Sequence, residues 1–173
     1  MMGEIKDTMN KAMDALAGTG GKMSAAMTTG ADGFVQNAAI GDLYEITAAR
    51  MALARARSAE VRTMAANMIK DHTTSTHHLM AALEMRETPE LSPLPAEPDA
   101  RRATMLKHLD EAQDEAFDTT YLDQQVLAHE ETVSLMRSYA SGGDNAQLRS
   151  YAAGTLPVVE RHLARVKELR GQI

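Results

Sequence analysis

Apolar residues recur every three or four positions along most of the chain, which is the spacing of one face of an α-helix. This pattern predicts helices over residues 33–57, 59–86, 99–111, 114–141 and 144–169. Ser58 is expected to cap the second helix, and Asp144, with Gln147 three residues on, to cap the last. Gly142-Gly143 should end the helix before it. The pattern therefore predicts an all-α protein.

The lengths of the connections predict how these helices pack. One or two residues separate the first two helices, so they should form an antiparallel hairpin. Residues 87–98 hold Pro89, Pro93, Pro95 and Pro98, which forbid a helix and predict an extended crossover. Two helical hairpins joined by this crossover and a short helix favour a four-helix bundle over residues 32–173.

The N-terminal region follows a different pattern. Ile5, Met9, Met13 and Leu16 have helical spacing, so residues 4–17 are predicted to form a short amphipathic helix. The glycines at positions 18, 20 and 21 should end that helix. Residues 1–31 are therefore expected to be a flexible segment outside the bundle.

Each of the four long helices carries an apolar row that one polar side chain interrupts. The interrupting residues are Glu45, His72, His129 and His162. Glu45 lies 13 residues before Ser58 and His72 lies 14 after it, so a hairpin places the two level. His129 is near the middle of its helix, and His162 is expected about one helical turn, roughly 5 Å, off centre. The four side chains should therefore meet near mid-bundle.

Two interpretations of this convergence remain open. Three imidazoles and one carboxylate in an apolar interior suit a single Zn²⁺, or Cu²⁺ or Ni²⁺. Alternatively the same groups form a metal-free polar network, in which Glu45 accepts hydrogen bonds from the rings and Tyr44 or Tyr121 is a further partner.

Composition excludes several classes of function. The net charge of -6, the 3% aromatic content and the absence of Trp argue against nucleic-acid binding. With no Cys there are no thiolate metal sites and no Cys nucleophile. No apolar stretch reaches the roughly 18 residues that a membrane span requires, and no signal peptide is evident. The sequence therefore predicts no membrane insertion and a cytoplasmic location.

A set of short motifs, in order and spacing, resembles the bacterial family catalogued as domain of unknown function 4142. These motifs are Phe34-Val35, Glu45, Asp71-His72, Phe117-Asp118 with Tyr121, His129-Glu130, Leu156-Pro157 and His162-Leu163. The resemblance implies a ferritin-like helical bundle. Relatives in the wider ferritin-like group hold two metal ions through Glu-x-x-His pairs. Here Ile69, Val126 and Val159 stand three residues before the histidines, so di-iron chemistry of that type is not expected.

These observations predict a non-enzymatic, stress-associated binding or structural protein that holds one metal ion through Glu45, His72, His129 and His162. One alternative is a metal-dependent redox or oxygen-handling enzyme that uses the same residues. The second is a metal-free scaffold with a buried His/Glu network. The acidic surface and the methionines of the N-terminal segment suit a homodimer or a protein partner.

Overall fold

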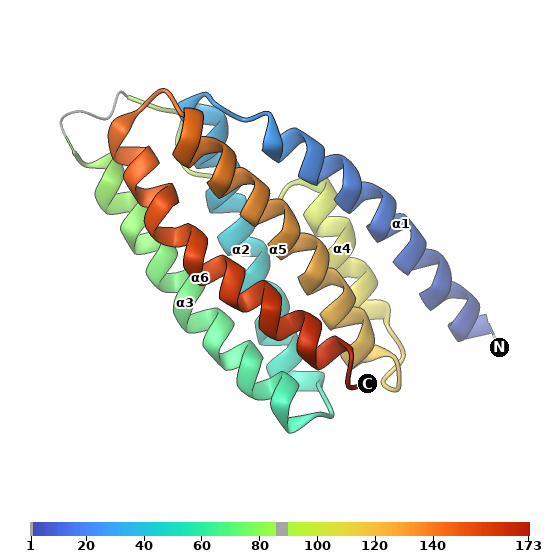
Figure 1. The fold of residues 1–173 in the computed structure, drawn as a ribbon. Coiled ribbons are helices and arrows are strands. Elements are labelled where there is room, and N and C mark those ends of the chain that lie inside the picture. The colour runs from blue at the N-terminus through green and yellow to red at the C-terminus, as the bar shows by residue number, and fades with distance from the viewer. Residues whose placement is uncertain (1, 86–89) are drawn as a thin grey trace.

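A computed structural model describes residues 2–85 and 90–173, and it confirms the all-α class. Within those residues the chain forms six helices and no strand (Figure 1). They are α1 (Met2–Ala26), α2 (Ala31–Arg55), α3 (Ala59–Leu83), α4 (Ala100–Glu111), α5 (Phe117–Gly142) and α6 (Ala146–Arg170). None of these helices is long and apolar enough to cross a membrane.

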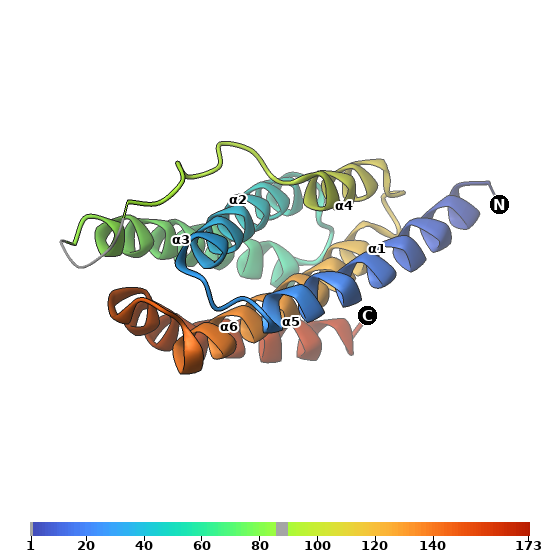
Figure 2. The same cartoon turned by 90° about the horizontal axis from the view of Figure 1, so that it is seen from above.

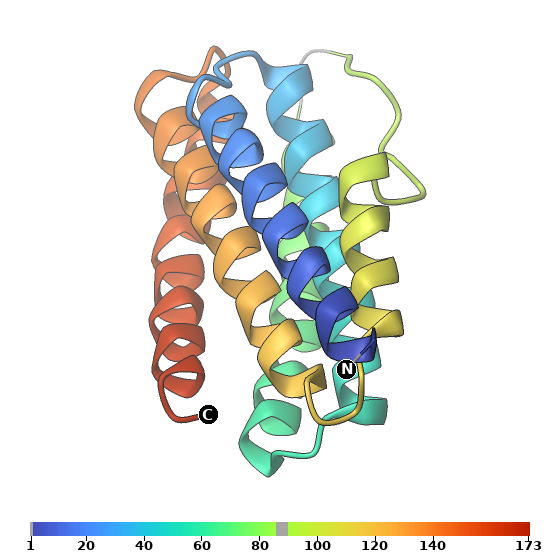
Figure 3. The ribbon, with the colours of Figure 1, turned by 90° about the vertical axis from the view of Figure 1, so that its right-hand side faces the viewer.

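Four helices surround the centre of the molecule. The α2–α3 hairpin faces the α5–α6 hairpin, with α2 against α5 and α3 against α6. Helix α1 lies along the outer side of α5, and α4 packs beside α2 and α1 (Figures 2 and 3). A four-helix bundle alone, as predicted, does not describe this fold, because α1 and α4 add a further helical layer to the four central helices.

The helix ends show how local sequence sets the fold. The side chain of Ser58 accepts a hydrogen bond from the amide of Val61 and caps α3, as predicted. The predicted cap of α6 was wrong by one residue. Asn145, rather than Asp144, accepts from the amide of Leu148, because the carboxylate of Asp144 is engaged by the hydroxyl of Tyr139 at 2.8 Å.

Helix α1 does not end at its glycines, so the predicted break at residues 18–21 was wrong. A Cβ added at Gly18 would come within 3.0 Å of the Leu127 side chain, and one at Gly21 within 2.5 Å of Oε2 of Glu131. The missing side chains let α1 approach α5 closely, and this packing outweighs the helix cost of glycine, about 1 kcal/mol each. The division of the chain at residue 31 stays a prediction.

The crossover between α3 and α4 is non-helical from residue 90 to residue 99, as its prolines predict. Hydrogen bonds connect this crossover to α2. The amide of Ser92 donates to Asp32 at 2.8 Å, and the side chain of Gln36 donates to the carbonyl of Pro93 at 3.0 Å. Pro89 lies outside the described residues.

The core consists of two apolar clusters with a polar layer between them. One cluster contains Tyr44, Met68 and Phe117, and the other contains Phe34 and Tyr139 with their neighbours. The rings of Phe34 and Tyr139 stack at 3.9 Å. Buried polar residues of the four central helices lie between these clusters. This polar layer contains Asp42, Glu45, His72, Gln125 and His129. Helix α5 buries three further polar residues, Thr120, Gln124 and Glu131. The fold thus brings polar groups to the middle of an apolar interior.

Candidate metal centre

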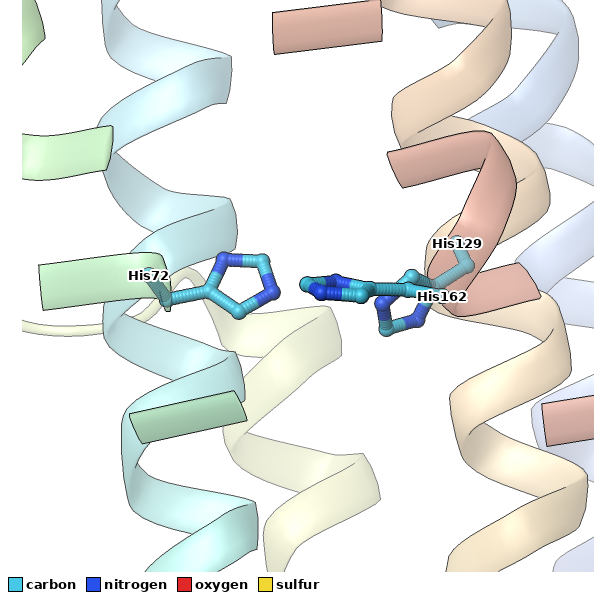
Figure 4. Close-up of side chains that lie close together, drawn as sticks. All are labelled: His72, His129 and His162. Atoms are coloured by element: carbon cyan, nitrogen blue, oxygen red, sulfur yellow. The ribbon is translucent and has the colours of Figure 1, made fainter. Parts of the chain in front are cut away.

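Three histidines from three helices converge in the polar layer. They are His72 of α3, His129 of α5 and His162 of α6 (Figure 4). The ring centroid of His72 lies 5.8 Å from the centroid of His129 and 5.8 Å from that of His162. The centroids of His129 and His162 are 5.6 Å apart. One ring nitrogen from each lies within 4.8 Å of the others. His162 therefore joins the group despite its predicted offset along the bundle.

Carboxylates hold two of the three rings. Nδ1 of His72 lies 2.7 Å from Oδ1 of Asp42, and Nε2 of His162 lies 2.9 Å from Oδ2 of Asp71. Thr76 donates to the second oxygen of Asp42 at 3.1 Å and fixes that carboxylate in turn. A carboxylate accepts a hydrogen bond from the N–H of the imidazole nitrogen it faces, so in the neutral ring the other nitrogen keeps its lone pair. This is the tautomer that a metal ligand requires.

The third ring is held by the backbone. Nδ1 of His129 lies 2.9 Å from the carbonyl oxygen of Gln125, one turn earlier in α5. Oε1 of Glu45 lies 3.5 Å from the same nitrogen, and Oε2 of Glu45 accepts from the side chain of Gln125 at 2.7 Å. His129 is 1% exposed. Its Nδ1 therefore has its partners on one side of the ring, and Nε2 is on the other.

The remaining ring nitrogens have no hydrogen-bond partner among the described residues. They are Nε2 of His72, Nε2 of His129 and Nδ1 of His162, and all three are buried. A buried polar atom without a partner costs about 1–3 kcal/mol. Three such atoms on three converging rings form a group that could hold a metal ion.

The protonation of the three rings is set by burial and by their neighbours. Burial lowers the pKa of His129 well below its usual value, and the positive charges of His72 and His162 lower it further. Burial also lowers the pKa of His162, although the hydrogen bond that the ring makes to Asp71 opposes this. At His72, burial acts in the same direction, but the hydrogen bond with Asp42 and the charge of Glu45 outweigh it, so its pKa is raised.

Glu45 was predicted as the fourth ligand, and the structure does not bring it into the histidine group. It is 2% exposed and lies on the far side of His129, next to Nδ1 rather than Nε2. Burial raises its pKa to about 7, although the charge of His72 and the hydrogen bond from Gln125 oppose this. Its position suits a group that orients and charge-balances His129.

The size of the group fits a single transition-metal ion. Zn–N bonds of about 2.0–2.1 Å place two tetrahedral nitrogen ligands roughly 3.4 Å apart. Since the present nitrogens lie within 4.8 Å, the longest separation needs to shrink by about 1.5 Å at most, a movement that side-chain torsions supply. A cavity of about 20 Å³ borders His72 and His162, which is room for one occupant the size of a water molecule.

Sequence reasoning missed part of this centre. Asp42 was not predicted, although it lies three residues before Glu45, a spacing that puts both on one face of α2. Asp71 directly precedes His72 in α3 and reaches His162 instead. A further buried histidine, His108 of α4, is 7% exposed and lies 2.7 Å from Asp14 of α1. It is buried because α1 covers this part of α4.

Comparison with known proteins places the chain within a family and a fold. The model of the family described as "Domain of unknown function (DUF4142)" matches residues 16–169. A solved structure described as a DUF305 fragment from Deinococcus radiodurans is similar, with a TM-score of 0.66 and 14% sequence identity. The similarity covers 81% of this chain and 94% of that chain. At this identity the likeness concerns the fold alone. No curated protein matches the chain.

Proposed function

The chain belongs to the DUF4142 family, and we propose that it is a metal-binding helical protein with one transition-metal ion at its centre. His72, His129 and His162 supply the three protein ligands. The four central helices act as a ferritin-like bundle that holds these rings in place, without the carboxylates of a di-iron site. The protein binds the ion for a structural or storage purpose and is not an enzyme.

The observation that carries this proposal is the set of three buried nitrogens without hydrogen-bond partners. The metal-free network that the sequence left open would pair the rings with Glu45 and with Tyr44 or Tyr121. The hydroxyl of Tyr44 instead donates to Gln124 at 3.1 Å. The hydroxyl of Tyr121 and Oε1 of Glu45 lack a hydrogen-bond partner among the described residues. The network alternative therefore leaves one nitrogen of each ring without a hydrogen bond, whereas a metal ion would be a partner for all three.

The ligand type and the surrounding charge indicate which ion is preferred. Neutral imidazoles suit Zn²⁺, and also Cu²⁺ or Ni²⁺. Asp42 and Asp71 stand directly behind two of the ligands and Glu45 behind the third, so negative charge compensates the ion within the buried layer. We propose Zn²⁺ as the first choice, because imidazole nitrogens are among its usual protein ligands and its tetrahedral geometry suits rings that converge from three helices.

One feature favours a second candidate function. Three protein ligands and a small adjoining cavity leave a coordination position for an exchangeable molecule, which a catalytic metal requires. The volume of about 20 Å³ limits that molecule to the size of water or dioxygen. A redox or oxygen-handling enzyme is therefore the alternative, and it would require a redox-active ion such as copper in place of zinc.

The test is metal analysis of protein purified without a histidine tag. We expect one ion per chain, and calorimetric titration of the metal-free protein with Zn²⁺ should give one site. His129→Ala should abolish that site. His77→Ala is the matched control, because His77 lies on α3 one turn and a half beyond His72 and is exposed. It should bind as the parent does.

The outcomes separate the candidates. A stoichiometric zinc ion and no turnover support the binding protein, whereas a redox-active ion with a reaction that His129→Ala abolishes supports the enzyme. Chelator should lower the melting temperature of the metal-loaded protein, because an ion that binds only the folded state stabilises it by mass action. No binding and no change on chelation would establish the metal-free scaffold and end the proposal.

A further inference from the structure

Helix α1 exposes an apolar stripe along its outer face. The stripe consists of Ile5, Met9, Met13, Leu16 and Met23, with Met27 directly after the end of the helix. Their positions follow helical spacing, so the stripe lies on one side of α1, opposite the side that packs on α5. Each is between 54% and 81% exposed, and most of the large exposed apolar side chains of the described protein belong to this stripe. Figure 3 shows α1 on the outside of the molecule.

The charged side chains of α1 turn away from the stripe. Each lysine of the helix forms an ion pair with the layer behind it, at 3.2–3.3 Å. The pairs are Lys6 with Glu111, Lys11 with Asp123 and Lys22 with Glu130. Asp7 and Asp14 are buried, and Asp14 contacts His108 of α4 and accepts a hydrogen bond from Gln124 of α5. The outer face of α1 is therefore left to apolar and small residues, which is the composition of the core of a protein interface.

The exposed apolar area of the stripe matches the area that one partner contributes to a protein–protein interface. From their exposed fractions, the six side chains present on the order of 800 Å². The largest apolar patch of a typical monomer is about 300–600 Å². Each partner in a standard-size protein–protein interface buries about 800 Å². The stripe alone therefore supplies the area that one partner needs.

The order of residues in the stripe is the same from both ends. Position 16 is its midpoint. Position 5 is as far from 16 as position 27, and position 9 is as far as position 23. When two copies of α1 cross antiparallel at position 16, Ile5 therefore meets Met27 of the other copy, Met9 meets Met23, and Leu16 meets Leu16. Such self-complementarity is what a two-fold symmetric interface requires.

A gap in the stripe fits the same arrangement. Met13 has no large residue at the matching distance on the other side of Leu16, where Thr19 and Gly20 stand. A Cβ added at Gly20 would have no neighbour within 4 Å. In the antiparallel pair the Met13 side chain of one copy faces this gap in the other, so a protruding residue meets a hollow.

We propose that α1 is the interface of a homodimer, in which two copies of this chain pack antiparallel through the stripe with Leu16 on the two-fold axis. The dimer does not depend on the metal centre, which lies on the other side of α5 from the stripe. In this dimer the N-terminal methionines serve as adaptable contact residues.

The first test is the mass of the protein in solution, measured by light scattering or sedimentation at micromolar concentrations. We expect a dimer. Leu16→Glu brings two carboxylates together on the axis and should weaken the dimer by about 100-fold or more. Leu53→Glu is the matched control, since Leu53 is an exposed leucine of α2, 41% exposed and outside the stripe. It should leave the dimer unchanged, and circular dichroism should show the same helix content for both variants.

The second test fixes the orientation, and it uses the absence of Cys in the chain. Leu16→Cys should form a disulfide-linked dimer on oxidation, because the two positions meet on the axis. Met27→Cys alone should not, since the two copies of position 27 would lie about 33 Å apart at 1.5 Å per residue. A mixture of Met27→Cys and Ile5→Cys chains should link to each other.

A wild-type protein that remains monomeric would overturn the proposal, as would a dimer that Leu16→Glu leaves intact. Cross-linking of Met27→Cys to itself would show a parallel pair and overturn the antiparallel geometry. A monomer that binds phosphatidylcholine vesicles through the stripe would show that the surface serves a membrane face, which also contradicts the homodimer.

Discussion

The buried carboxyl of Glu45 should make the metal-free protein less stable as the pH rises, and Glu45→Gln should remove this dependence. Burial raises the pKa of Glu45 from 4.5 to about 7 in the folded protein. A carboxyl with a higher pKa in the folded state binds its proton more tightly there. Its contribution to stability is therefore complete below pH 4.5 and is lost as the pH rises through about 7.

The magnitude follows from the two pKa values. A difference from 4.5 to about 7, at 1.36 kcal/mol per pKa unit, corresponds to about 3 kcal/mol of unfolding free energy. Gln has nearly the same shape as Glu and carries no charge. The stability of Glu45→Gln relative to the parent should therefore rise by about 3 kcal/mol between pH 4.5 and pH 8.

Urea unfolding of both proteins in the presence of chelator, followed by circular dichroism at several pH values, measures this difference. Most other titrating groups are shared by both proteins, so their contributions largely cancel. His72 is the exception, because the charge of Glu45 raises its pKa, and the measured difference includes its titration. A difference between the two proteins that stays constant from pH 4.5 to pH 8 would refute the reasoning. It would mean that the carboxyl of Glu45 titrates in the folded state as it does in water.

Three further predictions test other parts of the structure. Asp42→Asn should weaken Zn²⁺ binding about 10–100-fold by calorimetry, because the negative charge behind the His72 ring is lost although an acceptor oxygen remains; unchanged affinity would show that this charge is incidental. In the parent, Zn²⁺ affinity should fall about tenfold per pH unit below the raised pKa of His72, since a proton competes with the ion for that ring; a flat profile would remove His72 from the ligands. Phe34→Ala should lower the unfolding free energy by about 3–5 kcal/mol, because the ring is fully buried and stacked on Tyr139; a loss below 1 kcal/mol would contradict this packing.

The meeting of the three histidines was predictable from the sequence, because helical spacing and a short hairpin fix both the face and the level of a residue. Counting from the Ser58 cap placed His72 near mid-bundle, and the structure confirms that cap and that level. The offset predicted for His162 did not keep it out of the group. Residue counting locates a Cα atom, while the direction of the ring depends on its side-chain torsions.

The carboxylates were harder to assign. Glu45 and Asp42 lie three residues apart on the same face of α2, and the sequence gives no reason to choose between them. The choice depends on the rotation of α2 about its own axis, which is set by packing against α3 and α5. Asp42 reaches the nitrogen of His72 and Glu45 faces His129. Spacing predicts a face roughly 100° wide, and this is too broad to separate a ligand from the residue behind it.

The N-terminal helix shows where local propensity misleads. Three glycines within four residues indicate a break, yet α1 continues to Ala26 because Gly18 and Gly21 allow close contact with α5. This packing has a second consequence that the sequence did not predict. With α1 in place, Asp14 reaches His108, and this histidine becomes buried.

Anomalous X-ray diffraction at the zinc edge, from crystals grown with one equivalent of Zn²⁺, tests the central claim most directly. We predict a single anomalous peak per chain, about 2.0–2.1 Å from one nitrogen each of His72, His129 and His162. Those nitrogens should be Nε2, Nε2 and Nδ1, the atoms without a hydrogen-bond partner here. A peak at the exposed pair His77-His78, or no peak in the polar layer, would contradict the account.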